Sequence, residues 1–150
     1  MSPPSPARDR PDVRVLTEIG IIAQLSATAL ERLLPAGLSA AQFGVLNHFA
    51  RRGGEETPAH LADAFQVTRG AMTNTLARLE AQGLVAVRPD AGDGRRKQVS
   101  ITAKGLDVRE AALKATKPRL DAIRAAIPAT EFEAALPFLS RLRAWLDDNR

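Results

Sequence analysis

Cysteine is absent from this 150-residue chain, and histidine occurs only twice. Without thiols the chain can form no disulfide bond, no thiolate zinc site and no thiol-based redox sensor of its own. The two histidines, His48 and His60, lack the i, i+4 spacing of a metal-binding pair on one helix. We therefore expect neither a metal site nor thiol chemistry.

Aromatic residues are also scarce, at 4% of the sequence, so a core must be built mainly from leucine, alanine, isoleucine and valine. Alanine and leucine favour helix, and a low aromatic content argues against a large β-sandwich. The apolar fraction of 45% and the charged fraction of 25% are close to the average of soluble globular domains. The length suits one domain with long flanking helices.

No apolar run approaches the roughly 18 residues that a membrane-spanning helix needs. A secretory signal is not expected, because the apolar segment that it requires is missing from residues 1–6. We therefore expect a cytoplasmic protein without a membrane partner. Four prolines within residues 1–11 predict a disordered N-terminal tail.

Local signals locate three helices in the first half of the chain. The helical spacing of apolar residues predicts a helix over 12–34. A capping-box pattern that starts at Ser39 predicts a second helix from about Ala40. Thr57 is followed by a proline, which predicts a third, short helix over 58–65.

Thr68 is expected to be the N-cap of a fourth helix that runs to Glu80. The side of this helix that should pack on the two preceding helices carries Met72, Leu76 and Leu79. The opposite side carries small and polar residues, namely Gly70, Thr73, Asn74 and Ala77, with Arg69 and Arg78 flanking them. Such a stripe is ordinary on most surfaces. It also suits a helix that enters a DNA groove, because it offers donors and acceptors without bulk.

The residues after this helix predict a β-hairpin. Residues 82–88 end the helix and start a strand, and residues 98–102 read as the returning strand. The turn between the two strands carries the basic residues Arg95, Arg96 and Lys97. A helix, a strand, a basic turn and a strand in this order are typical of a winged helix-turn-helix. We therefore predict a mainly α fold with a small β-hairpin wing.

Positive charge is concentrated in the same segment. The whole chain has a net charge of +4, and residues 68–105 alone have a net charge of +4. The rest of the chain is therefore neutral in sum. A local positive patch on a neutral body is the electrostatic signature of a phosphate-binding face. We predict that a lobe over 39–105 binds double-stranded DNA.

Residues 106–150 should form a second helical region with an apolar side. Pro118 should kink or break its first helix, a capping-box pattern at 130–133 should start its last helix, and Pro137 should bend that helix. This region and the helix over 12–34 lie outside the winged unit, and an apolar stripe needs a partner.

The flanking helices either complete a monomeric core or interlock with a second copy. We favour the second arrangement, a two-fold homodimer. Its predicted interface comprises Val15, Ile19, Leu120, Ile123, Leu139, Leu142 and Trp145.

Several short motifs stand out within 39–105: Leu61-Ala62, Thr68-Arg69-Gly70, Arg78-Leu79-Glu80-Ala81-Gln82-Gly83-Leu84-Val85, Asp90, Asp93-Gly94-Arg95 and Ile101-Thr102-Ala103-Lys104-Gly105. On these residues the chain resembles the MarR family of bacterial transcription regulators, and the wing pattern is the most diagnostic of them. The flanking helices agree with that family in length and order.

The resemblance implies a homodimer that binds a pseudo-palindromic operator in double-stranded DNA and usually represses nearby genes. The fourth helix is then expected in the major groove. The residues expected on its base-facing part are Arg69, Gly70, Thr73 and Asn74.

For the wing, the resemblance matches Arg95 to the arginine that enters the minor groove. Asp93 matches the acidic residue that steadies this arginine. Arg95, Arg96 and Lys97 stand in a row, so the choice between Arg95 and Arg96 as the inserted side chain stays open.

Members of the family often release DNA when a small aromatic or anionic molecule binds. The resemblance therefore implies an effector of that class and no cofactor, and its pocket is not located by the sequence. The absence of cysteine argues against the peroxide-sensing branch of the family. The presence of only two histidines argues against a zinc-sensing branch.

Two other classes of protein compete with a DNA-binding regulator. An enzyme is not expected, because the sequence has no Ser/His/Asp order, no paired carboxylates in a pocket pattern and no glycine-rich phosphate loop. We interpret His48 as a hydrogen-bonded helix residue and not as a catalytic base. It could instead line an effector pocket. The alternative that remains is a winged-helix module that binds another protein without DNA specificity.

Overall fold

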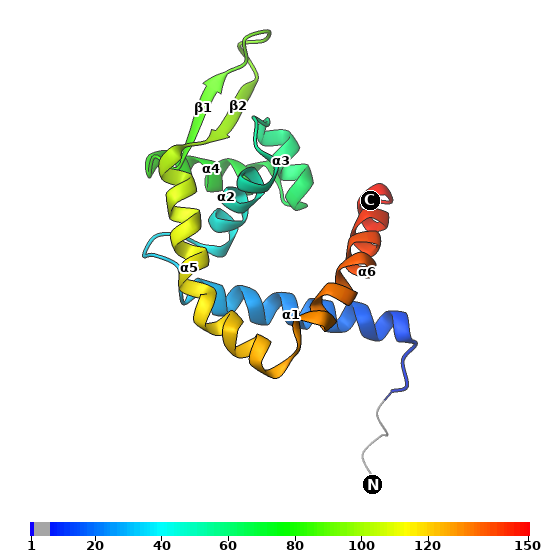
Figure 1. The fold of residues 1–150 in the computed structure, drawn as a ribbon. Helices are drawn as coiled ribbons and strands as arrows, with labels where there is room; N and C mark the ends of the chain where they lie inside the picture. Colours follow the sequence, from blue (N-terminus) through cyan, green and yellow to red (C-terminus); the bar gives the residue numbers. More distant parts are fainter. Residues whose placement is uncertain (2–6) are drawn as a thin grey trace. The chain divides into compact units, whose positions relative to one another are not determined.

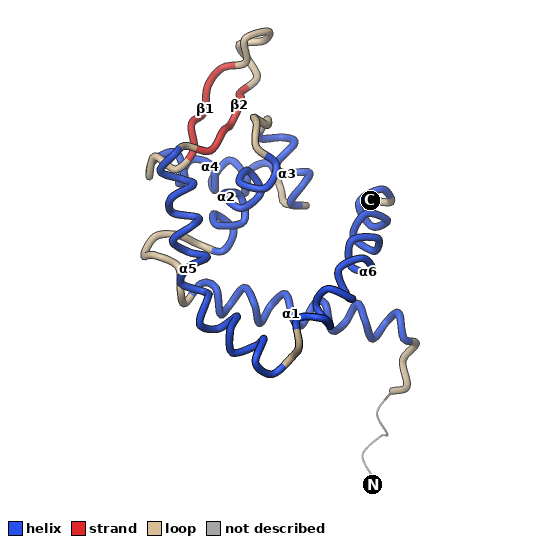
Figure 2. Tube along the Cα trace, viewed as in Figure 1, coloured by secondary structure: helices blue, strands red, loops and turns tan. Residues whose placement is uncertain are grey.

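The computed structural model describes residue 1 and residues 7–150, and in these residues the chain forms six helices and two strands (Figures 1 and 2). Of the predicted disordered tail, residues 2–6 lie outside the described residues, and Pro11 already belongs to the first helix. The chain divides into two compact units, Met1–Leu113 and Lys114–Arg150.

Helix α1 spans Pro11–Glu31 and begins with its proline in the first turn, where a missing N–H costs nothing. It ends three residues before the predicted limit of 34. Pro35 disfavours the helical conformation at Leu34, so the chain must leave the helix before it reaches the proline. The amides of Leu33 and Leu34 both still donate to the carbonyl of Leu30, at 2.8 and 3.0 Å.

The predicted starts of the next two helices are confirmed. Helix α2 spans Ala40–Arg52, and Ser39 and Gln42 form the reciprocal capping box with both hydrogen bonds at 3.1 Å. Helix α3 spans Pro58–Phe65, and the Thr57 hydroxyl accepts from the amide of His60. Local polar side chains therefore define both helix starts.

Helix α4 spans Arg69–Ala81, and the hairpin that follows pairs β1, Val85–Pro89, with β2, Lys97–Ile101. The strands are antiparallel, with Val87 opposite Val99. The first strand ends one residue later than predicted, and the second lies one residue earlier than the predicted 98–102. The hairpin extends from the lobe next to α3 and α4 (Figure 1).

The core of the first unit lies between α2, α3, α4 and the base of the hairpin. Met72, Leu76 and Leu79 of α4 are buried in it, as the sequence predicted. The other buried apolar residues are Leu38, Phe43, Val45, Leu46, Phe49, Leu61, Ala62, Leu84, Val85, Val99 and Ala112. One face of α4 is therefore fixed in the core, and its other face is free for a partner.

Helix α5 spans Ala103–Ala126 and approaches the turn after α4 very closely. A Cβ atom at Gly105 would lie 2.1 Å from the carbonyl oxygen of Leu84, so only glycine fits there. The hydroxyl of Thr102 donates to the Gly83 carbonyl at 2.7 Å and accepts from the Gly105 amide at 3.0 Å. These contacts explain why the sequence motif has a threonine at 102 and a glycine at 105.

The predicted boundary between 105 and 106 falls inside α5, because the first turns of this helix pack on the lobe through Ala112. Helix α5 also continues through Pro118 without a break. A kink or a break was predicted because proline removes a helical hydrogen bond, and only the break is wrong. The loss of one bond leaves the rest of a 24-residue helix in place.

In the second unit, helix α6 spans Ala129–Asp148 and follows the last turns of α5. The predicted capping box at 130–133 is wrong. The N-cap is Pro128, without a side-chain hydrogen bond, and Thr130 already lies inside the helix. The fixed φ of proline and a bond from the Glu131 amide to the Pro128 carbonyl at 3.1 Å define this start instead. Helix α6 also runs through Pro137.

The expectation that no segment is apolar enough to span a membrane is wrong for α1. By length and composition alone this helix is long and apolar enough to cross a membrane, although Arg14 and Glu18 interrupt its apolar residues. A helix with an apolar surface on several sides is also typical of a buried helix between protein segments. One such helix is weak evidence for a membrane.

Candidate nucleic-acid interface

The outward side of α4 is slim and polar. Gly70, Thr73, Asn74 and Ala77 are all exposed, and the flanking Arg69 and Arg78 are exposed as well. The Thr73 hydroxyl donates to the Arg69 carbonyl at 2.8 Å. Its proton is therefore used inside the helix, and Thr73 presents its methyl group and a lone pair outward. For the amide of Asn74, no hydrogen bond is found within residues 1 and 7–150.

Thr68 is the N-cap of α4, and its hydroxyl accepts from the amide of Ala71 at 3.1 Å. Helix α3 ends just before it with Gln66 in the left-handed conformation, at φ 52°. The Gln66 side chain donates to the Asp63 carbonyl at 2.8 Å and so closes the end of α3. The turn between α3 and α4 is therefore defined by side-chain caps on both sides.

We predict that Thr68→Ala lowers the free energy of unfolding by about 1 kcal/mol, because the first-turn amide of α4 loses its acceptor. Urea unfolding followed by circular dichroism measures this difference. Thr68→Ser keeps the oxygen and serves as the matched control, with stability close to that of the parent protein. Equal stability of the Ala variant and the parent would contradict the capping role.

The tip of the wing is built by two aspartates that bind its backbone. The Asp93 carboxylate accepts from the amide of Arg95 at 3.0 Å, and the Asp93 carbonyl accepts from the amide of Arg96. Asp93 therefore holds Arg95 through its main-chain amide. The side chains of Arg95, Arg96 and Lys97 are exposed.

Asp90 has a role at the wing that the sequence did not assign. Its carboxylate accepts from the Gln98 side chain and from the amide of Gly92, both at 2.8 Å. The hydrogen bond from Gln98, then that from Gly92, and with them the positive charge of Arg96, lower the pKa of Asp90 below its ordinary value. Asp90 is thus held as a carboxylate that ties the two sides of the turn together.

Two of the seven basic residues in 68–105 are used inside the protein. Arg88 pairs with Glu55, and Lys104 donates to the Gln82 carbonyl at 2.9 Å, next to the end of α4. The other five are exposed and form no ion pair within the described part of the chain: Arg69, Arg78, Arg95, Arg96 and Lys97. These five are the cations predicted for DNA contact, and they lie on α4 and on the wing.

The loop between α2 and α3 carries an interaction that the sequence did not indicate. His48 of α2 is buried, and its Nε2 lies 3.0 Å from Oε1 of Glu56. The His48 ring also contacts the rings of Phe49 and Phe65. His48 is therefore a buried, partnered helix residue. Among the described residues no group of three or more histidine, aspartate or glutamate side chains is arranged to hold a metal.

The residues of the predicted dimer interface are accessible in the single chain. Val15, Ile19 and Leu142 are half-buried, and the other four, Leu120, Ile123, Leu139 and Trp145, are exposed. No residue of α1 or α6 is buried. Each of these two helices therefore presents apolar surface that the rest of the described chain does not cover.

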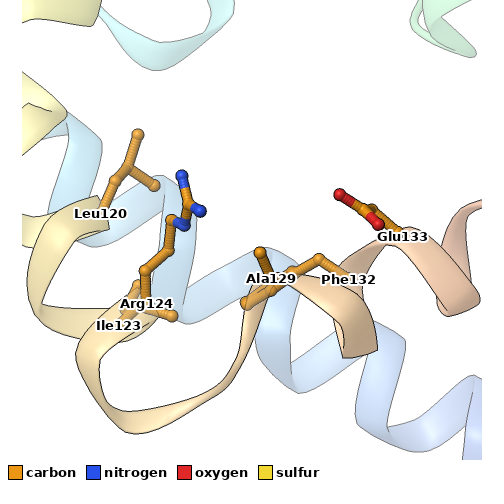
Figure 3. Close-up of a pocket in the computed structure, with 6 residues that line it drawn as sticks. All are labelled: Leu120, Ile123, Arg124, Ala129, Phe132 and Glu133. Carbon is orange, nitrogen blue, oxygen red and sulfur yellow. The ribbon is translucent and has the colours of Figure 1, made fainter.

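The second unit contains a hollow of about 360 Å³ in the bend between α5 and α6. Leu120, Ile123, Ala129 and Phe132 give it an apolar lining. The side chains of Arg124 and Glu133 extend to the same open side of it (Figure 3). Two of the predicted interface residues, Leu120 and Ile123, thus belong to this hollow.

A helical lobe with an exposed, slim α4, followed by a hairpin with cations at its tip, defines a winged helix-turn-helix protein. BpsR of Bordetella bronchiseptica has the same fold, with a TM-score of 0.70 over 87% of this chain and 98% of that chain, at 22% identity. Its structure concerns the regulation of its DNA binding by 6-hydroxynicotinic acid.

Three comparisons show which family this winged protein is similar to. The sequence profile of the MarR family matches residues 36–96. The transcriptional regulator HosA of Escherichia coli is 38% identical over 76 residues, 51% of this chain and 56% of HosA. A mutant of MarR from E. coli complexed with operator DNA is 26% identical, with a TM-score of 0.69 over 87% of this chain and 94% of that chain.

The chain is therefore similar to the MarR family in sequence over residues 36–96, and in fold over most of its length. Its match to the curated relative spans about half the length of that protein.

Proposed function

We propose that the protein is a sequence-specific regulator of transcription that binds double-stranded DNA as a homodimer in the bacterial cytoplasm. One observation carries this proposal. The exposed side of α4 has no bulky side chain except its flanking arginines, and the five exposed cations lie on α4 and the wing of the same compact unit. A groove-reading helix and a cationic loop can then bind one duplex together.

In this proposal α4 lies in the major groove. Asn74 reads base edges there with its amide, which can pair with adenine through two hydrogen bonds. Thr73 contributes its methyl group and lone pair, and Gly70 lets the helix come close. Arg69 and Arg78 bind the phosphates beside the groove, and this is supported by their exposure at the two ends of the stripe.

The homodimer is proposed because two parts of the chain expose apolar surface. Helix α1 exposes several large side chains, and the second unit exposes a further set. An apolar face of this extent on a soluble protein marks an interaction surface. A second copy would also cover the hollow between α5 and α6 through Leu120 and Ile123. The operator is then pseudo-palindromic, because the symmetry of the sites follows that of the dimer.

Repression and its relief by a small aromatic or anionic effector complete the proposal. It is supported by the shared fold with BpsR, whose DNA binding is regulated by 6-hydroxynicotinic acid. Fluorescence anisotropy of the protein–DNA complex during titration with aromatic carboxylates tests this part. A release that saturates at a fixed stoichiometry supports an effector, and unchanged anisotropy for every compound contradicts it.

Selection of genomic DNA fragments by the purified protein tests DNA recognition itself. We expect enrichment of a few fragments that share an inverted repeat, with binding that weakens steeply as salt rises, because phosphate contacts release counterions. Equal recovery of all fragments, with no salt dependence, would favour the alternative of a winged-helix module that binds another protein. Retention on heparin and its loss with salt is a rapid first measurement.

We predict that Arg95→Ala lowers operator affinity about tenfold or more and weakens the preference for A·T pairs beside the half-sites. A hydrogen bond to a charged group contributes about 1.5–3 kcal/mol, and narrow A·T-rich minor grooves attract arginine. Binding to duplexes that differ only in these flanks measures both effects. Lys97→Ala is the matched control and should leave the flank preference intact. A larger change of flank preference in Arg96→Ala would assign the minor groove to Arg96.

A further inference from the structure

The loop between α2 and α3 holds the wing through two consecutive glutamates. Glu55 pairs with Arg88 of β1 in a two-pronged contact, in which Arg88 Nε donates to Glu55 Oε1 at 2.8 Å and Arg88 Nη2 donates to Glu55 Oε2. A bidentate contact between a guanidinium and a carboxylate fixes direction as well as distance. Through this contact the first strand of the wing is tied to the helical lobe.

Glu56 ties the second strand with its backbone. Its amide donates to the Val99 carbonyl at 3.0 Å, and its carbonyl accepts from the Val99 amide at 2.8 Å. The Glu56 side chain is only 10% exposed and faces His48 Nε2 at 3.0 Å, His60 Nδ1 at 3.5 Å and Arg52 Nε at 3.9 Å. The loop is thereby anchored in α2 and α3, so that it forms a fixed base for the wing.

Such a base is needed because a two-stranded hairpin has little stability of its own. The wing tip and α4 have to meet the same duplex, and displacements of about 1 Å weaken a contact that depends on geometry. The pairing with Val99 secures β2, and the base of the hairpin is buried at Val85. The outer part of β1 is secured by the contact between Arg88 and Glu55.

We infer that Glu55 is a positioning residue for DNA recognition: through Arg88 it holds the wing in the orientation that lets the wing tip and α4 contact one duplex. Arg88 therefore acts inside the protein and does not bind phosphate, although the sequence placed it within the basic patch. The role in recognition rests on the proposed function. The effect on the wing itself does not.

Four variants test this inference: Glu55→Gln, Arg88→Gln, both changes together, and the exchanged pair Glu55→Arg with Arg88→Glu. Glu80→Gln is the matched control, because it removes an exposed negative charge from the same lobe without touching the loop. All these positions are exposed, so we expect every variant to fold. Three quantities are measured on each: the thermal unfolding midpoint, the preference for the central half-sites and for their flanks, and amide hydrogen exchange in β1 and β2.

Each single change should reduce the flank preference about 1.4- to five-fold, the range that exposed ion pairs contribute. The double change should reduce it no further, and the exchanged pair should restore it. The preference for the central half-sites and the unfolding midpoint should stay near those of Glu80→Gln. A general structural role would lower the midpoint and both preferences together, which would overturn the inference.

A second result would also overturn it. If Arg88→Gln weakened binding to every duplex alike, reduced the salt dependence, and were not rescued by the exchanged pair, Arg88 would be a phosphate contact. If the parent protein bound no duplex, the proposed function would fail. Hydrogen exchange alone would then test whether the contact between Glu55 and Arg88 holds the wing. Faster exchange of the β1 amides in Glu55→Gln than in Glu80→Gln supports the tie, and equal exchange contradicts it.

Discussion

The Leu139→Glu variant is expected to be monomeric and to bind an operator with two half-sites about a hundred- to ten-thousand-fold more weakly than the parent protein. Leu139 is 40% exposed in the single chain, on a helix that buries no residue. A carboxylate placed there would have to be buried without a partner in the proposed dimer. The loss is large because each copy would then bind its half-site without the other.

Analytical ultracentrifugation and binding to duplexes with one or two half-sites measure this result. Ala144→Glu is the matched control, since five residues along a helix bring it to the other side of α6. It should remain dimeric. Affinity for a single half-site should be the same in both variants. If the Leu139→Glu protein is still dimeric and its operator affinity is unchanged, α6 is not part of the dimer interface.

The second large effect is expected for Asn74→Ala. A good bidentate contact with a base discriminates by about 1–3 kcal/mol, and a dimer makes it twice. We therefore expect the variant to lose most of its preference for the operator over a duplex altered at the contacted base pair. Binding to unrelated duplexes should change little, because phosphate contacts are independent of sequence.

Competition between the operator and single-base variants measures that preference. Thr75→Ala is the matched control: it also removes a polar side chain from α4, on the half-buried side where the hydroxyl donates to the Ala71 carbonyl at 3.1 Å. It should keep the preference of the parent protein. An equal loss of affinity on every duplex in Asn74→Ala would show that Asn74 contacts phosphate only.

The sequence predicted those parts of the fold that depend on neighbours in the chain. The starts of α2 and α3 were predicted correctly. At each start the side chain of the N-cap residue accepts a hydrogen bond from the backbone amide three residues later. The buried side of α4 followed from helical periodicity. The order of helix, strand, basic turn and strand was enough for the winged fold.

The sequence could not predict contacts between distant residues. Glu55 and Arg88 are 33 positions apart, and the pairing of Glu56 with Val99 joins a loop to a strand. No local pattern marks either contact. For His48, likewise, the sequence predicts only a position on a helix. Its contact with Glu56 is seen only in the folded structure. The close approach that explains Gly105 is visible only when the Leu84 carbonyl is placed next to α5.

Two prolines lie inside the helices after the wing. Pro118 was expected to kink or break α5 and Pro137 to bend α6; the helices are continuous, so the break at Pro118 is wrong, and the kink and the bend stay predictions. Pro128, which does set the start of α6, was overlooked in favour of a threonine two residues later. Helix α1 also ends before a proline: it stops at Glu31, three residues earlier than the apolar periodicity indicated, and Pro35 follows.

Footprinting of the protein on its selected genomic fragment tests most directly whether two copies present α4 and the wing to one duplex. The account predicts two protected half-sites whose centres are roughly 34–36 Å apart, one turn of the double helix. It also predicts weaker protection at the A·T-rich flanks with Arg95→Ala. Protection of a single half-site, or the absence of any selected fragment at low salt, would contradict it.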